Sequence, residues 1–114
     1  PLIKEDYAKC QKLLENIALD PNCAPFLVPV QWEELGLLDY PKIVTRPMDF
    51  DTLKKNMLNG QFTTLEDFLG EIQLIWDNCK LYNMQGSEIY KICEKMERVC
   101  RRELQKFKNQ HGYN

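Results

Sequence analysis

The sequence predicts an all-α domain: an antiparallel four-helix bundle with a long ordered loop between the first and second helices. Three long segments repeat apolar residues at spacings of three and four, which is typical of helices that bury one face. No segment alternates apolar and polar residues with a period of two, so we expect no sheet. Short links flank the second long helix, and such links join antiparallel neighbours in bundles.

The first helix is expected over residues 2–19. Its apolar face repeats at spacings of four and three: Ile3, Tyr7, Cys10, Leu14 and Ile17. The helix must end near Asp20, because Pro21 disfavours the α conformation of the residue before it.

The segment 20–48 is expected to be a single ordered loop. Loops of this length are uncommon in compact domains unless they are functional or disordered. Disorder is not expected, because apolar residues are frequent between Phe26 and Val44. Five of the six prolines also lie in this segment, and they stiffen the chain. We therefore expect the loop to pack against one end of the bundle and to contribute to a binding site.

A short helix is expected over residues 49–59, directly after the loop. Either Asp49 or Asp51 is a suitable N-cap, and Gly60 is a suitable end. Its inward-facing residues are expected to be Leu53, Met57 and Leu58.

Two long helices complete the bundle, at residues 64–82 and 87–109. The first has the strongest apolar stripe: Leu65, Phe68, Leu69, Ile72, Ile75, Trp76, Cys79 and Tyr82. Two pairs are suitable caps for its start: Thr63 with Glu66, or Thr64 with Asp67. The second has a stripe at Ile89, Cys93, Met96, Cys100, Leu104 and Phe107. Cations are frequent in its C-terminal half, where the helix dipole favours them.

Composition limits the classes of site that the chain can hold. The 114 residues suit one domain, 1–114, and because the chain begins at Pro1 we expect it to be excised from a larger protein. The five cysteines include no C-x-x-C pair, and His111 is the only histidine, so no metal site is expected. We expect five reduced thiols in a cytosolic or nuclear protein. No apolar run approaches the ~20 residues that span a bilayer.

Short motifs lie along the loop and at the end of the helix expected over residues 64–82. They are, in order, Ala24-Pro25-Phe26, Pro29-Val30, Leu35, Leu37, Asp39-Tyr40-Pro41, Arg46-Pro47-Met48-Asp49-Phe50 with Thr52-Leu53, and Asn78-Cys79-Lys80-Leu81-Tyr82-Asn83. In this order and at these separations the sequence resembles the bromodomain family over nearly its whole length. The resemblance implies a left-handed bundle that binds acetylated lysine and catalyses no reaction, with no cofactor and no metal.

The resemblance also implies roles for individual residues. Asn83 would donate a hydrogen bond to the acetyl carbonyl, and Tyr40 would hold a water against the same oxygen. The loop would supply one wall of the pocket: Pro25, Phe26, Val30, Leu35 and Leu37. Tyr82 would support the pocket, and Ile89 would stand at its rim. Two residues depart from the family pattern, because Ala24 stands where Trp is frequent and Leu38 where Pro is frequent.

The chemistry of acetylation explains why such residues would be needed. Acetylation converts a lysine ammonium into a neutral amide with one carbonyl acceptor and a methyl group. An Asn amide offers two N–H donors and no charge, which suits a neutral acceptor. An unmodified ammonium in an apolar slot would be a buried charge without a partner. No acidic residue is expected among the slot residues named above.

The expected partners are acetylated lysine peptides, most simply histone tails, which implies a nuclear protein. We expect neither a sequence-specific nucleic acid nor a membrane as partner, and a monomer as the isolated domain. The net charge of −2 agrees with a basic partner. The loop acids Glu33, Glu34, Asp39 and Glu88 are either ordinary surface charge or a field that attracts basic tails.

Several alternatives remain open from the residues alone. Asn83 is also a suitable helix C-cap, and Tyr40 is also a suitable packing residue. Cys79 is either a buried inert thiol or part of the pocket border. The cations of residues 91–108 are either a solvated face or contacts to DNA phosphates. An enzyme is disfavoured because the lone histidine, His111, lies near the C-terminus and nucleophilic catalysis needs a base beside a nucleophile. A scaffold that binds a partner helix is the second alternative, and it would show no preference for acetyl groups.

Overall fold

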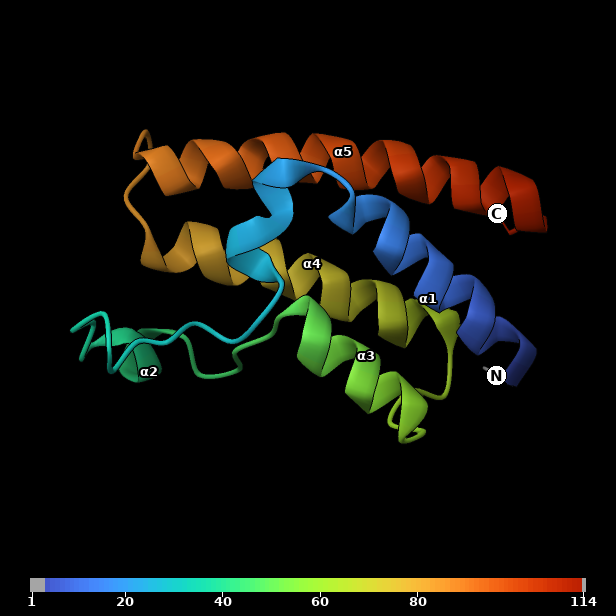
Figure 1. Cartoon of the computed structure of the whole chain (residues 1–114), viewed down its shortest axis with the longest axis horizontal. Helices are drawn as coiled ribbons and strands as arrows, with labels where there is room; N and C mark the ends of the chain where they lie inside the picture. Colours follow the sequence, from blue (N-terminus) through green and yellow to red (C-terminus); the bar gives the residue numbers. More distant parts are fainter. Residues whose placement is uncertain (1–3, 114) are drawn as a thin grey trace.

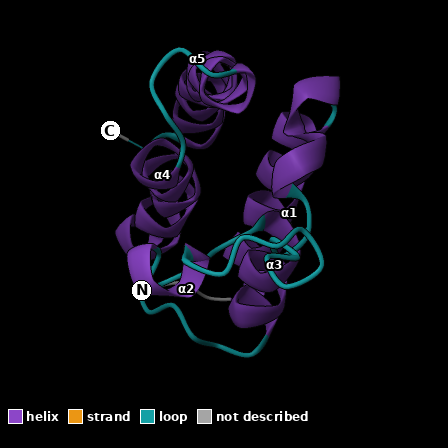
Figure 2. Cartoon of the chain, turned by 90° about the vertical axis from the view of Figure 1, so that its left-hand side faces the viewer, coloured by secondary structure: helices purple, strands orange, loops and turns teal. Residues whose placement is uncertain are grey.

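Figure 1 shows the computed structural model, which describes residues 4–113. Four helices form the bundle: α1 (Lys4–Ala18), α3 (Phe50–Leu58), α4 (Leu65–Tyr82) and α5 (Glu88–His111). Helix α5 packs against α4 and α1, and α3 packs against the same two helices. Figure 2, viewed from one end, shows only helices and loops in this part of the chain. The predicted all-α bundle is confirmed; the first two residues expected in helix 1 lie outside the described residues.

Side-chain caps determine where three of the helices begin. Of the two candidates for α3, Asp49 is the cap, because it accepts hydrogen bonds from the Thr52 backbone N–H at 2.9 Å and the Thr52 hydroxyl at 2.6 Å. Thr64 caps α4 by accepting from the Asp67 N–H at 3.1 Å. Ser87 caps α5. Each cap satisfies a backbone donor that lacks a partner within the helix.

Helix α5 extends two residues beyond the expected end at 109. It ends at His111, where Gly112 takes the left-handed conformation (φ 72°) that glycine adopts without steric cost. The Tyr113 ring then stacks on Phe107, with ring centroids 5.4 Å apart. The tail therefore continues the apolar face of the helix, and the sequence contains no proline to end it earlier.

The loop between α1 and α3 contains two short helices that the sequence did not predict. A 3₁₀ helix covers Pro21–Phe26, and its N-cap Asp20 accepts from the Asn22 N–H at 2.9 Å. A single α turn, α2, covers Tyr40–Ile43. Both helices are too short for apolar periodicity to reveal. Each has a proline in its first two positions, which helix geometry allows.

The loop is packed against the bundle over only part of its length. Phe26, Tyr40 and Val44 are buried, as expected. Leu35 and Leu38, however, are 65% and 69% exposed, so the expectation that the apolar residues hold the whole loop down was wrong for this stretch. Exposed apolar residues near a cavity are compatible with a binding surface.

The core lies between the four helices and is centred on Trp76, which is 1% exposed. The Phe26 ring meets Trp76 edge-on, with centroids 5.0 Å apart, so the loop contributes directly to the core. All five cysteines are free and buried. Within residues 4–113, no helix combines the length and apolar character needed to cross a membrane.

Candidate functional site

A cavity of about 510 Å³ opens at one end of the bundle, between the loop, the end of α4 and the start of α5. The nine residues to which the resemblance assigns a role all line it: Pro25, Phe26, Val30, Leu35, Leu37, Tyr40, Tyr82, Asn83 and Ile89. The volume lies in the range of sites for small organic groups. The structure thus brings together residues that are up to 64 positions apart in the sequence, Pro25 and Ile89.

Asn83 terminates α4, and its side chain is held in place by the helix itself. The Asn83 Nδ2 donates a hydrogen bond to the Cys79 carbonyl at 2.9 Å, and the backbone N–H donates to the same oxygen at 3.0 Å. The backbone is extended (φ −94°, ψ 147°), not left-handed as in a C′ cap. The amide has two hydrogens, and its other contact, to the Cys79 sulfur, is long at 3.6 Å. Asn83 therefore caps the helix and still has donor capacity for a ligand.

Two tyrosines form one side of the cavity. The Tyr40 and Tyr82 rings meet edge-on, with centroids 4.9 Å apart. The Tyr82 hydroxyl donates to the Asp39 carboxylate at 2.7 Å, which ties α4 to the loop. Burial raises the pKa of Tyr40, and the hydrogen bond to Asp39 raises the pKa of Tyr82. Both phenols therefore stay protonated at neutral pH.

Asn78 also lines the cavity, and the sequence did not identify it as a separate functional residue. It is 8% exposed, and its Nδ2 donates to the Arg46 carbonyl at 2.8 Å. The Arg46 guanidinium in turn pairs with Glu71 on α4 at 2.8 Å. These two contacts fasten the end of the loop to α4. The signal was present in the sequence, because a polar residue next to an apolar helix stripe needs a buried partner.

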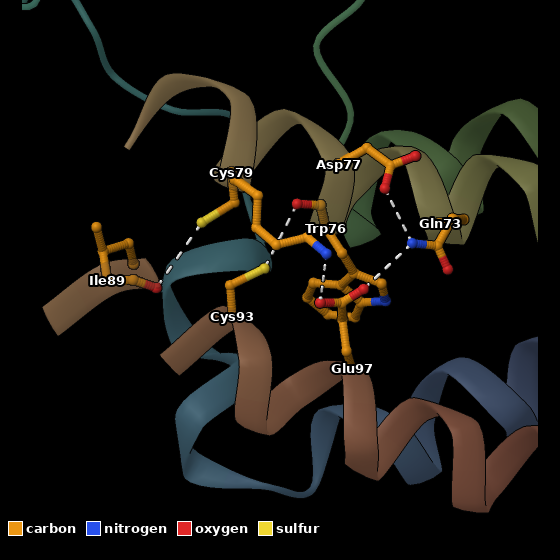
Figure 3. A network of polar contacts seen from close by, with 8 residues as sticks. Gln73, Trp76, Asp77, Cys79, Ile89, Cys93 and Glu97 are labelled. Carbon is orange, nitrogen blue, oxygen red and sulfur yellow. Dashed lines mark hydrogen bonds and ion pairs between the residues drawn. The ribbon is translucent and has the colours of Figure 1, made fainter. Parts of the chain in front are cut away.

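Cys79 borders the cavity and is also buried, so the two positions that the sequence left open are compatible. Figure 3 shows its sulfur near the Ile89 carbonyl at 3.8 Å, while the Cys93 thiol donates to the Trp76 carbonyl at 3.4 Å. The neighbouring Cys93 thiol lowers the pKa of Cys79, against the opposing effect of burial. The two thiols thus join α4 to α5 directly beneath Asn83.

The charge around the cavity is negative. Residues 20–40 contain four carboxylates and no lysine or arginine. Glu34 lines the cavity and is exposed, so the expected absence of acids applies to the nine residues named above but not to the whole lining. Asp39 is engaged by Tyr82, and Glu33 does not line the cavity. Among the described residues Glu34 forms no ion pair, which leaves it available to a basic ligand.

Ala24 lies at the edge of the cavity, where the family frequently has Trp. It lines the cavity and is exposed. The outer wall at this position consequently lacks an aromatic surface.

Comparisons with known proteins identify the family of the chain. The bromodomain family model matches residues 10–95. The chain is 32% identical over 109 residues to tyrosine-protein kinase BAZ1B of Xenopus laevis, covering 96% of this chain and 7% of that protein. It is 34% identical over 99 residues to protein cbp-1 of Caenorhabditis elegans, covering 87% and 5%. It is 32% identical over 108 residues to nucleosome-remodeling factor subunit NURF301 of Drosophila melanogaster, covering 95% and 4%.

The chain spans less than a tenth of the length of these relatives, so the match concerns a module and not a whole protein. The family match covers both the loop and helix α4, which between them supply most of the cavity lining. The family match covers most of the chain, and the four-helix bundle with a cavity at its end agrees with it. The chain belongs to the bromodomain family.

Proposed function

We propose that the cavity binds the acetylated lysine side chain of a protein tail, most simply a histone tail, and that the chain is a non-catalytic reader. The family is known for reading acetyl-lysine in chromatin-associated proteins. The observation that carries the proposal is Asn83: its amide is held by Cys79 and lines an otherwise apolar cavity. A neutral amide donor suits the acetyl carbonyl. The Tyr40 hydroxyl forms no hydrogen bond to a protein group among the described residues. We assign it the role of holding a water molecule that binds the same acetyl carbonyl.

Selectivity against unmodified lysine follows from the electrostatics of the cavity. The nine residues assigned to it include no carboxylate, so an ammonium placed beside Asn83 would lose its hydration without gaining a charged partner. Glu34 is exposed and belongs to the opening, where flanking cations of the peptide remain in water. The cavity thus favours the acetyl group, while its surroundings favour a basic peptide.

The affinity for a single mark should be modest. Burial of ~200 Å² of apolar ligand surface supplies ~5 kcal/mol at ~25 cal/mol per Å², before ordering costs are subtracted. This corresponds to Kd values on the order of micromolar or weaker. We expect the isolated domain to bind as a monomer.

The names of the relatives support a nuclear setting for this function. One is a subunit of a nucleosome-remodeling factor. Another is named a tyrosine-protein kinase, but the chain spans only 7% of it. We propose that the module serves a chromatin protein in the nucleus.

The direct test compares one lysine-rich peptide with and without a single acetyl group. Isothermal titration should show saturable binding of the acetylated peptide and at least ~10-fold weaker binding of the unmodified one, because the ammonium would be desolvated without a partner. Equal binding of the two peptides would instead support a scaffold that binds a partner helix.

Ala24→Trp should tighten the binding of acetylated peptide. The new indole would restore ~100 Å² of apolar wall, which corresponds to up to ~1–2 kcal/mol. Titration of both proteins with the same peptide measures the change. Circular dichroism confirms the fold, and an unchanged Kd in a folded variant would mean that position 24 does not face the ligand.

Glu34→Gln should slow the association of an acetylated, lysine-rich peptide and leave its dissociation rate nearly unchanged. An exposed charge at the opening acts mainly on the encounter, and raising salt from ~50 to ~300 mM should reduce the difference. Glu33→Gln is the matched control, since Glu33 does not line the cavity. Stopped-flow rates that fall equally in both variants, or with a neutral peptide, would count against steering by Glu34.

A further inference from the structure

A second hollow, of about 330 Å³, lies between α1 and the C-terminal part of α5. Its charged lining consists of Lys9, Lys12, Lys106 and one acid, Glu103, and we call it the basic groove. The groove lies at the end of the molecule opposite the acetyl-lysine cavity, near the two termini (Figure 1). Helices far apart in the sequence therefore bring their cations together here.

The cations of the groove are mostly unpaired. Lys9 and Lys12 form no ion pair within the described part of the chain. Glu103 is shared between Lys106 at 3.2 Å and Arg102 at 3.8 Å, so one carboxylate faces two cations. The Lys106 and Arg102 side chains are still 66% and 63% exposed. A net positive charge consequently remains accessible to an anionic partner.

A row of cations continues from the groove along α5. Arg98, Arg102 and Lys106 follow one another at intervals of four, which places them on one face of the helix. At 1.5 Å per residue this row extends about 12 Å. A single phosphate would contact only part of this row. Each strand of a nucleic acid duplex carries a phosphate every ~3.4 Å along the helix axis, so several phosphates can lie along the ~12 Å row.

The loop around the cavity and the C-terminal part of α5 carry net charges of opposite sign. Residues 98–111 contain five lysines and arginines and one glutamate, although the chain as a whole has a net charge of −2. The loop, residues 20–48, contains four carboxylates and two cations, Lys42 and Arg46. Helix α1 is balanced, with three lysines and three acids. The longest extent of the molecule is 42 Å, several Debye lengths at physiological salt (~8 Å), so the loop acids are largely screened from the end of α5.

We infer that the basic groove and the adjoining α5 row bind the phosphate backbone of double-stranded DNA without reading its sequence. The choice of DNA among polyanions rests on the proposed function, since an acetylated histone tail lies beside DNA. The geometry allows both contacts at once, because the cavity and the groove are at opposite ends of the bundle. The sequence alone left the role of these cations open. We assign the role from the way α1 and α5 bring the cations together.

The test is the binding of a fluorescent ~20-base-pair duplex, followed by anisotropy. The wild-type domain should bind weakly, and with about three phosphate contacts the association constant should fall ~20-fold between 50 and 150 mM salt. Lys9→Glu with Lys12→Glu and Lys106→Glu should weaken binding at least ~10-fold. The neutral triple variant, with Gln at the same three positions, should show a smaller loss and covers the case in which charge reversal disturbs folding.

The matched control reverses three exposed lysines outside the groove and the cavity, Lys42, Lys54 and Lys91, and changes the net charge equally. Binding that falls equally in the control would overturn the inference, because only net charge would then matter. So would tighter binding to single-stranded RNA, or to vesicles with ~30% anionic lipid, than to the duplex. Asn83→Asp should bind the duplex like the wild type, so failure of the acetyl-lysine proposal and failure of this inference are distinguishable.

Discussion

Asn83→Asp should abolish the binding of acetylated peptide at neutral pH while the domain stays folded. The substitution preserves shape but replaces two donors by oxygens that only accept. A carboxylate oxygen would then face the acetyl carbonyl, at a cost of ~1–3 kcal/mol or more for a charged group. The same change removes the hydrogen bond that Asn83 donates to the Cys79 carbonyl, so the free energy of unfolding should fall by ~1–2 kcal/mol.

Asn59→Asp is the matched control for this variant. Asn59 is the C-cap residue of α3, lies outside the cavity and is exposed, so the same chemical change occurs there without a ligand nearby. Its affinity for acetylated peptide should equal that of the wild type. Titration calorimetry at pH 7 measures all three proteins, and wild-type affinity in Asn83→Asp would remove Asn83 from its assigned role.

Phe26→Ala should have the second large effect, on both stability and binding. Phe26 is 7% exposed, meets Trp76 edge-on in the core and lines the cavity. Loss of a buried phenyl ring lowers the free energy of unfolding by ~3–5 kcal/mol, which a domain with ~5–15 kcal/mol tolerates. The wall of the cavity would lose its contact with the ligand stem, so acetylated peptide should bind at least ~10-fold more weakly.

Phe62→Ala separates the two consequences. Phe62 is 8% exposed and packs edge-on against Phe68, but it does not line the cavity. Urea unfolding should show a comparable loss of stability, whereas the folded protein should bind acetylated peptide as the wild type does. If Phe62→Ala weakened binding as much as Phe26→Ala, the effect of Phe26 would reflect general loosening of the fold.

The helices were predictable because each one has a periodic apolar face, and two of them have a cap that the sequence identifies. The prediction that Leu58 faces inward was wrong, because this residue at the end of α3 is 56% exposed. Thr64 and Asp49 are side chains whose hydrogen bonds depend only on residues three positions away, so local sequence contains the information. The two short helices inside the loop were not predictable in this way. Their positions depend on contacts across the chain, such as the Tyr40 ring against Tyr82 and the Phe26 ring against Trp76, which no local pattern specifies.

The residues of the site were named from family resemblance, and their convergence on one cavity required the structure. Periodicity alone places Asn83 at a helix end and leaves its role open. What sequence could not supply were the contacts across the chain: Asn78 with the Arg46 carbonyl, and Glu34 in the cavity lining. The exposure of Leu35 and Leu38 was likewise missed, because composition shows that a residue is apolar but not what covers it.

The role of Asn83 is tested most directly by titrating the ¹⁵N-labelled domain with acetyl-lysine amide, the single modified residue without flanking peptide. If the amide of Asn83 donates to the acetyl carbonyl, its side-chain ¹H–¹⁵N signals should shift in a saturable way. The signals of Asn59, which lies outside the cavity, should not move. Free lysine amide at the same concentration should leave both unchanged, because its ammonium would have to be desolvated without a partner. Saturable binding of acetyl-lysine amide with no shift at Asn83, or equal shifts with free lysine amide, would contradict the role proposed for Asn83.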